Sequence, residues 1–146
     1  MTASYKELAL ESRTQFELID ITAEVRAAVA GSGAKNGAVV VFAPHTTAAV
    51  RINHNEPLLK QDLMKMLYRL APIDMSYAHD FFEVRSGSKP DERSNGHAHV
   101  KAFLLGASQS IPLQDGELVL GDRQSIFFVE LDGGRKRRVI IQIIGE

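Results

Sequence analysis

One short apolar run constrains the fold of this chain more than any other feature: residues 37–44, with the sequence GAVVVFAP. It is too short for a typical helix and rich in β-branched side chains, which indicates a central strand covered on both faces. The run stops at His45, Thr46 and Thr47, and a second apolar stretch follows at residues 48–53. We expect that stretch to be a neighbouring strand. The polar residues between the two then lie at a strand end, where a rigid scaffold presents side chains to ligands.

The other segments indicate more strands than helices. Strands are predicted at 4–12, 15–21 and, followed by a polar loop, within 76–96; helices are predicted at 22–30, 55–72 and 97–106. The tail, residues 108–146, indicates three or four antiparallel strands, with tight turns at Asp115-Gly116 and Gly133-Gly134. Strands and helices do not alternate regularly. The sequence therefore predicts one α+β domain over residues 1–146, with a mostly antiparallel sheet.

The second predicted helix is the clearest one. Asn55 is placed to cap its first turn, Pro57 suits the first helical position, and Pro72 ends it. One face is predicted to carry the apolar residues Leu59, Leu63, Met66, Leu67 and Leu70.

Composition excludes several classes of protein. The chain has no cysteine, so it has no disulfide frame, and any metal must take nitrogen and oxygen ligands. A net charge of -1 argues against a nucleic-acid partner. No run approaches the roughly 20 apolar residues of a membrane span, and the first residues lack the apolar core of a signal peptide. We expect a cytoplasmic protein without a membrane partner.

The histidines and their neighbours are the candidate site residues. His45 ends a buried strand, and His79 lies between aromatic residues and beside an acid. His97 and His99 would share a face on a strand, but on the predicted helix they point about 200° apart, so only one faces a given site. Thr46 and Thr47 can bind phosphate through their hydroxyls or simply form a turn. Asp62, at the border of an apolar helix face, can turn towards a histidine or remain in solvent.

A cluster of basic residues follows the second tight turn. Strand alternation places Arg135 and Arg137 on one face, and Lys136 and Arg138 on the other. Arginine binds phosphate or carboxylate with two parallel hydrogen bonds, although charges also protect edge strands from aggregation. No Walker loop, dinucleotide fingerprint or nucleophile elbow is present.

Five motifs in one order resemble the YjbQ-like family: PHTTAAVRIN, YAHD, NGHAHVKAFLLGAS, GELVLGDRQSIFF and DGGRKRRVIIQIIGE. The resemblance runs from about Tyr5 to Glu146. It implies a compact α+β domain with a barrel-like antiparallel sandwich and two or three helices, assembled as a homotrimer with clefts between subunits. It also implies thiamine-phosphate synthase activity, a transferase reaction on a small phosphorylated substrate.

The resemblance assigns roles to particular residues. His45, His79 and His99 match family histidines that meet in one cleft around an anion or a divalent metal, for which three imidazoles favour zinc over magnesium. The implied catalytic residues are His45, Asn53, Asp62 and His99. The implied substrate-binding residues are Thr46, Thr47, Asn55, Lys101, Gln124, Arg135 and Arg137.

Two departures from the family pattern bear on function. His54 stands where the family has a glutamate between two asparagines, so an acid–base role there is vacant, taken by His54 or moved to Glu56. Asp122 and Arg123 replace a threonine and a tryptophan, which removes an aromatic stacking partner. Two alternatives therefore remain open: a trimer that binds a metal or an anion without turnover, and a metal-assisted hydrolase of a small phosphorylated or carbonyl compound.

Overall fold

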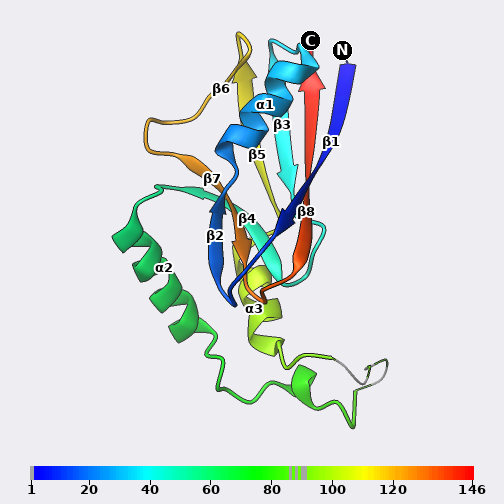
Figure 1. Ribbon diagram of the computed structural model, residues 1–146, viewed down its shortest axis with the longest axis vertical. Coiled ribbons are helices and arrows are strands. Elements are labelled where there is room, and N and C mark those ends of the chain that lie inside the picture. The colour runs from blue at the N-terminus through cyan, green and yellow to red at the C-terminus, as the bar shows by residue number, and fades with distance from the viewer. Residues whose placement is uncertain (1, 86, 88, 90–91) are drawn as a thin grey trace.

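The computed structural model describes residues 2–85, 87, 89 and 92–146, and it confirms an α+β fold of curled antiparallel sheets and helices (Figure 1). The strands are β1 (Thr2–Glu11), β2 (Glu17–Asp20), β3 (Gly37–Phe42), β4 (Ala48–Asn53), β5 (Ser108–Gln114), β6 (Glu117–Leu118), β7 (Ser125–Glu130) and β8 (Lys136–Gly145). The helices are α1 (Thr22–Ser32), α2 (Pro57–Leu70) and α3 (Gly96–Leu105), with a short 3-10 helix, η1, at Ala78–Asp80.

The strands form two antiparallel sheets. The larger has the order β1-β8-β3-β5-β6, so β3 lies between β8 and β5, and the predicted central position is confirmed. The prediction that both faces of this strand are covered is wrong, because Val39 and Val41 are buried but Phe42, on the other face, is 40% exposed. The smaller sheet has the order β2-β7-β4. The stretch at 48–53 is therefore a strand, but the prediction that it neighbours 37–42 in the same sheet is wrong. β4 pairs with β7 because the three residues after Pro44 carry the chain across to the other sheet.

The small sheet is buried on both faces. Ile126 and Phe128 of β7 pack with Val39, Val41 and Ile141 in a core between the two sheets, which α1 closes at one end (Figure 1). On the other face, the alternate β7 residues form a second core with residues of the two remaining helices, in a cluster of Phe127, Val129, Ala49, Leu67, Ala98 and Ala102. This two-sided burial places β7 and its end, Glu130, in the middle of the protein.

Three local expectations need correction. The cap of α2 is Glu56, whose carboxylate accepts the backbone N–H groups of Leu58 and Leu59, whereas the Asn55 amide donates to Asp20. Of the five residues predicted to form the apolar face of α2, only Leu67 is buried. No strand is present in the described part of 76–96, which holds η1 and turns; residues 86, 88, 90 and 91 of that prediction lie outside the described residues.

The turns after β5 and β7 serve different purposes. Asp115 and Gly116 have φ values of 53° and 81° and join β5 to β6 in a tight hairpin, as predicted. Gly133-Gly134 does not form a hairpin, since β7 and β8 belong to different sheets. A Cβ atom on Gly133 would overlap the backbone oxygen of Thr14, so glycine is required there by close approach of the chain.

Candidate functional site

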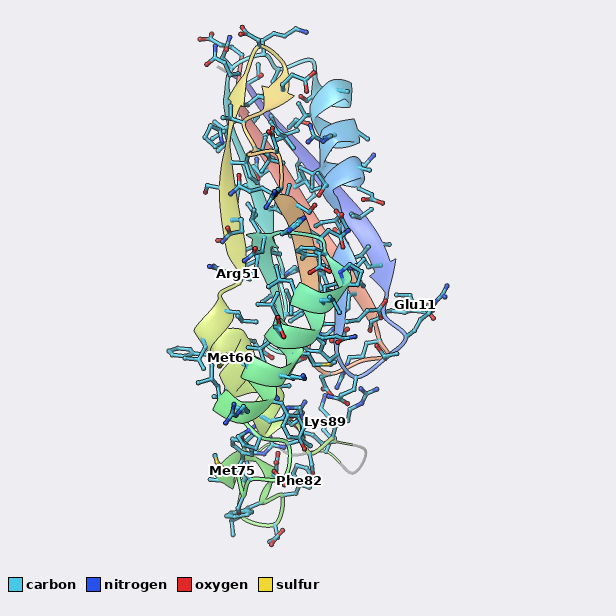
Figure 2. All side chains as sticks on the ribbon, turned by 90° about the vertical axis from the view of Figure 1, so that its left-hand side faces the viewer. Glu11, Arg51, Met66, Met75, Phe82 and Lys89 are labelled. Atoms are coloured by element: carbon cyan, nitrogen blue, oxygen red, sulfur yellow. The ribbon has the colours of Figure 1, made fainter. Side chains whose placement is uncertain are left out.

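An open cleft of about 950 Å³ lies where β3, α3 and β8 meet the loop that crosses between the sheets. His45 and Thr46 line it from that loop, His99 from α3 and Arg135 from the segment before β8. The loop before α3 contributes further polar residues, namely Lys89, Glu92, Arg93 and Asn95. Figure 2 shows Lys89 at the lower end of the protein, near the ends of the strands. Three segments distant in sequence, namely the loop after β3, α3 with the loop before it, and the residues around the start of β8, thus place imidazole, hydroxyl and guanidinium groups around one space.

A buried ion pair supports the floor of the cleft. Arg137 is 8% exposed and Glu130 is 0% exposed. Nε of Arg137 donates to Oε1 of Glu130 at 2.8 Å, and its Nη2 donates to Oε2. The same Nη2 donates to Oγ1 of Thr47 at 2.8 Å and to its backbone oxygen at 3.2 Å. The guanidinium therefore holds the 45–47 loop in place, and Thr47 is buried within this contact rather than open to solvent.

Glu130 is fully satisfied as a carboxylate. Besides Arg137, it accepts the Ser12 hydroxyl at 2.6 Å and the backbone N–H groups of Leu131 and Asp132, both at 3.0 Å. Burial by itself raises the pKa of Glu130, but the hydrogen bonds from Arg137 and Ser12 outweigh it and hold the pKa below its ordinary value. Glu130 is therefore ionised at neutral pH.

A second buried carboxylate, that of Asp132, orients two arginines that line the cleft. Asp132 accepts Nη2 of Arg135 at 2.6 Å and Nδ2 of Asn95 at 2.9 Å, and Arg93 lies 3.5 Å from its other oxygen. Burial raises the pKa of Asp132, and the bonds from Asn95 and Arg135 more than reverse this. The guanidinium group of Arg135 is thus already held in one orientation at the cleft wall. This reduces the side-chain conformational entropy lost when Arg135 binds an anion.

The cleft histidines are held in their neutral form. Nε2 of His45 lies 3.1 Å from both the backbone nitrogen and the backbone oxygen of Arg138, which fixes the ring against β8. Burial, followed by the charge of Arg137, lowers the pKa of His45. Burial, followed by His79, lowers the pKa of His99. A neutral imidazole can accept a proton, donate a hydrogen bond through its N–H group and ligate a metal.

These shifts predict acid sensitivity in the metal-free protein. The pKa values of His45, His97 and His99 are all lowered on folding, so the unfolded chain binds more protons as the pH falls below the ordinary value of about 6.5. The histidine contribution to stability is complete above that value and is lost as the pH falls through the folded pKa values. Urea unfolding with a chelator present is expected to give a lower free energy at about pH 5.5 than at about pH 7.5. An unchanged value would contradict the burial of these rings.

His79 joins His99 rather than His45. The rings of His79 and His99 meet edge to face with centroids 4.6 Å apart, and Nε2 of His79 is buried without a hydrogen-bond partner. His45 shares the cleft with His99. Across the ranges that the structure describes, no three His, Asp or Glu side chains are grouped closely enough to hold one metal ion. A single chain therefore places two histidines, His45 and His99, in the cleft wall. His79 does not line the cleft but packs against His99, with its Nε2 unpartnered.

Gly96 makes the contact between η1 and α3 possible. A Cβ atom there would lie 2.5 Å from Cβ and 2.9 Å from Cγ of Tyr77, the residue just before η1. Tyr77 cannot easily move, because it is buried and its hydroxyl donates to the backbone oxygen of Pro72 at 2.8 Å. The absence of a side chain at Gly96 thus brings His79 against His99.

We expect Gly96→Ala to lower the free energy of unfolding by about 1–3 kcal/mol, the usual effect of overpacking, although alanine is the better helix former by about 1 kcal/mol. Gly31→Ala is the matched control, because Gly31 lies in α1 and a Cβ there meets nothing within 4 Å. That variant is expected to gain about 0.5–1 kcal/mol. Urea unfolding of both variants checks the pair, and equal effects would show that the Tyr77 contact imposes no constraint.

Several of the predicted site residues are not in the cleft of a single chain. Asn53 and Asn55 lie at and beyond the far end of β4, a strand that spans about 17 Å. Asp62 is exposed on α2, and Gln124 is exposed, with Oε1 accepting the backbone N–H of Gly121 at 2.7 Å. Lys101 faces a different cavity together with His97. By contrast, His45, Thr46, Thr47, His99, Arg135 and Arg137 all line the cleft.

The helix argument for His97 and His99 agrees with the structure. Both residues are in α3, but His97 lines the cavity under α2 and His99 lines the cleft. Sequence reasoning missed the acidic partners Glu130 and Asp132. Glu130 is inside the apolar run IFFVEL and Asp132 directly follows it. A carboxylate buried there requires a cation, which the Arg-rich segment beginning at Arg135 supplies.

The fold and this cleft define a class of small α+β proteins with a histidine, threonine and arginine site at the strand ends. The chain matches the family model described as "UPF0047 protein YjbQ-like" over residues 6–146 and belongs to that family.

Relatives from distant organisms support this assignment. A UPF0047 protein of Methanothermobacter thermautotrophicus is 40% identical over 141 residues, which cover 97% of this chain and 92% of that protein. UPF0047 protein YugU of Bacillus subtilis is 35% identical, covering 96% and 98%. The crystal structure of a YbjQ-like protein of unknown function from Sulfolobus solfataricus superposes with a TM-score of 0.91 at 35% identity, covering 99% of each chain.

Proposed function

We propose that this chain is an enzyme that acts on a small phosphorylated metabolite in the cleft, and that thiamine-phosphate synthesis is the reaction to test first. The observation that carries the proposal is the convergence of His45, Thr46, His99 and Arg135 on one open space. Hydrogen-bond donors dominate its wall, and the nearby carboxylates of Asp132 and Glu92 are already paired with arginines. A wall of oriented donors is suited to phosphate oxygens.

The reaction can be written on these groups. The bond between the methylene carbon of hydroxymethylpyrimidine diphosphate and its bridging oxygen breaks, and pyrophosphate leaves with the electron pair. The ring nitrogen of the thiazole phosphate forms the new carbon–nitrogen bond with its own lone pair. Arg135, with Arg93 and Lys89 at the same rim, stabilises the charge on the leaving group, and Thr46 and the imidazoles of His45 and His99 orient phosphate oxygens.

A divalent metal, zinc before magnesium, belongs to the proposal but no step depends on it. The unpartnered Nε2 of His79 and the adjacent ring of His99 would hold it. A closed histidine site needs a third ligand, which one chain does not group with them among its described residues. Such an ion, when bound, supplies Lewis-acid polarisation of a phosphate oxygen. Elemental analysis of the purified protein tests its presence.

We also propose the homotrimer that the resemblance implies. α2 and α3 carry large apolar side chains in solvent: Phe103 is 88% exposed, Leu58 67% and Leu70 60%. Apolar surface of this kind is typical of an interface between subunits. Assembly is also what can bring Asn53, Asn55 and Gln124 of one copy to the cleft of another. Light scattering coupled to size-exclusion chromatography measures the mass, and a monomer would contradict the proposal.

The decisive assay incubates the native protein with hydroxymethylpyrimidine diphosphate and thiazole phosphate and measures thiamine phosphate and pyrophosphate, with and without a chelator. Product formation supports the proposed enzyme. Two other results favour the alternatives: pyrophosphate binding without turnover indicates an anion-binding protein, and metal-dependent hydrolysis of p-nitrophenyl phosphate indicates a hydrolase. A protein that neither binds pyrophosphate nor turns over any of these compounds would contradict a phosphate site.

A further inference from the structure

Lys101 is a buried cation that the proposed reaction does not use. It is 4% exposed and extends from α3 away from the cleft, beside His97, which is also 4% exposed. Its Nζ lies 2.8 Å from Nδ1 of His97. Within the described ranges, Lys101 forms no salt bridge with any Asp or Glu. An ammonium group has three donors, so its charge and two of its donors are left without a protein partner.

The two residues border a separate cavity of about 300 Å³ between α2, α3 and the loop before β2. Most of its wall is apolar: Phe16, Met64, Leu67, Tyr68, Ile73 and Leu131. Two other polar wall residues are hydrogen-bonded to the backbone. Thr14 donates its hydroxyl to the backbone oxygen of Phe16, and Gln15 donates its amide to that of Leu131, both at 2.8 Å. Among the described residues that line the cavity, Lys101 is thus the one cationic group, on a mostly apolar wall.

A buried charge is strongly unfavourable unless an opposite charge and hydrogen bonds accompany it. We propose that this cavity is a second ligand site, which takes a small carboxylic acid with an aromatic or branched apolar body. The carboxylate accepts the free donors of Lys101, and the body replaces water along the apolar wall. One negative charge matches the one unpaired positive charge, whereas a phosphate would bring a second charge into an apolar space. The cavity is large enough, since a dry cavity of about 150 Å³ holds benzene.

The test uses benzoate as the probe and benzyl alcohol as its uncharged match. Calorimetry on the native protein is expected to show benzoate binding at least about tenfold more tightly than benzyl alcohol, which corresponds to about 1.4 kcal/mol for the charge. Lys101→Met is expected to remove this preference, and Lys136→Met, at an exposed position in β8, is expected to keep it. His45→Ala is expected to leave benzoate binding unchanged. The proposal for this cavity and the proposal for the phosphate cleft can therefore be tested independently.

Methyl NMR of the unmodified protein keeps the test valid if Lys101→Met does not fold. Benzoate is expected to shift the methyl signals of Met64, Leu67 and Ile73, which line the cavity, and to leave those of Val39 and Val41 in the other core unchanged. No binding, equal affinity for both probes, or shifts confined to the His45 cleft would each overturn the inference.

Discussion

Replacing Glu130 with glutamine is expected to lower the free energy of unfolding by about 3–5 kcal/mol, the usual effect of removing one partner of a buried ion pair. The substitution keeps the shape of the side chain and removes its charge. Arg137, which is 8% exposed, is then left as a buried cation. Because the same guanidinium holds Thr47, we also expect the 45–47 loop to lose its position and pyrophosphate binding to weaken.

The surface pair of Glu7 and Arg138 is the matched control for this prediction. It joins the same two residue types at 3.3 Å, but its side chains are 44% and 50% exposed. Glu7→Gln is expected to change stability by no more than about 1 kcal/mol. Both variants are measured by urea unfolding at one fixed protein concentration, because assembly would make stability depend on concentration. Equal effects would show that water reaches the Glu130 pair.

A double variant separates stability from function. Glu130→Met with Arg137→Met removes both charges together, and replacing a buried pair with apolar residues is often neutral for stability. We expect it to be more stable than Glu130→Gln and to bind pyrophosphate poorly, because nothing then anchors Thr47. Normal binding by a stable double variant would show that the pair serves the fold alone.

The second large effect is expected at the cleft histidines. His45→Ala and His99→Ala are each expected to reduce kcat/KM for hydroxymethylpyrimidine diphosphate by about 10²-fold or more, a usual contribution of a positioned imidazole, and to abolish metal or anion binding. Both residues are half-buried at the cleft wall, so the fold should survive. Turnover and pyrophosphate calorimetry are measured beside circular dichroism of each variant.

Arg26→Ala serves as the control for the histidine variants. It removes an exposed cation of α1, which pairs with Glu117 at 3.9 Å. Figure 1 shows α1 in the upper part of the protein, away from α3, which carries the cleft residue His99. This control is expected to retain normal activity and binding. If His45→Ala and His99→Ala both keep full binding, the cleft is not the site, and if both unfold, these are core histidines.

The sequence by itself determined the class of fold and much of the cleft. The β-branched run at 37–42 indicates a central strand, and β3 is one, although only the face with Val39 and Val41 is fully buried. The 200° separation of His97 and His99 follows from helix geometry alone. Strand alternation likewise places Arg137 and Arg138 on opposite faces of β8, and the structure has Arg137 buried and Arg138 exposed. Such periodic patterns are local, so they can be interpreted without knowing which other segments of the chain pack against them.

Only the tertiary structure decided which segments meet. Periodicity does not encode strand partners, so the pairing of β4 with β7 and the separation of β7 from β8 had to come from packing of the two cores. The same packing joins Glu130 to Arg137, directs Lys101 into its own cavity and leaves Asn53 at the far end of β4. Each of these depends on burial of side chains against residues distant in the chain, and a side chain's type alone does not carry that information.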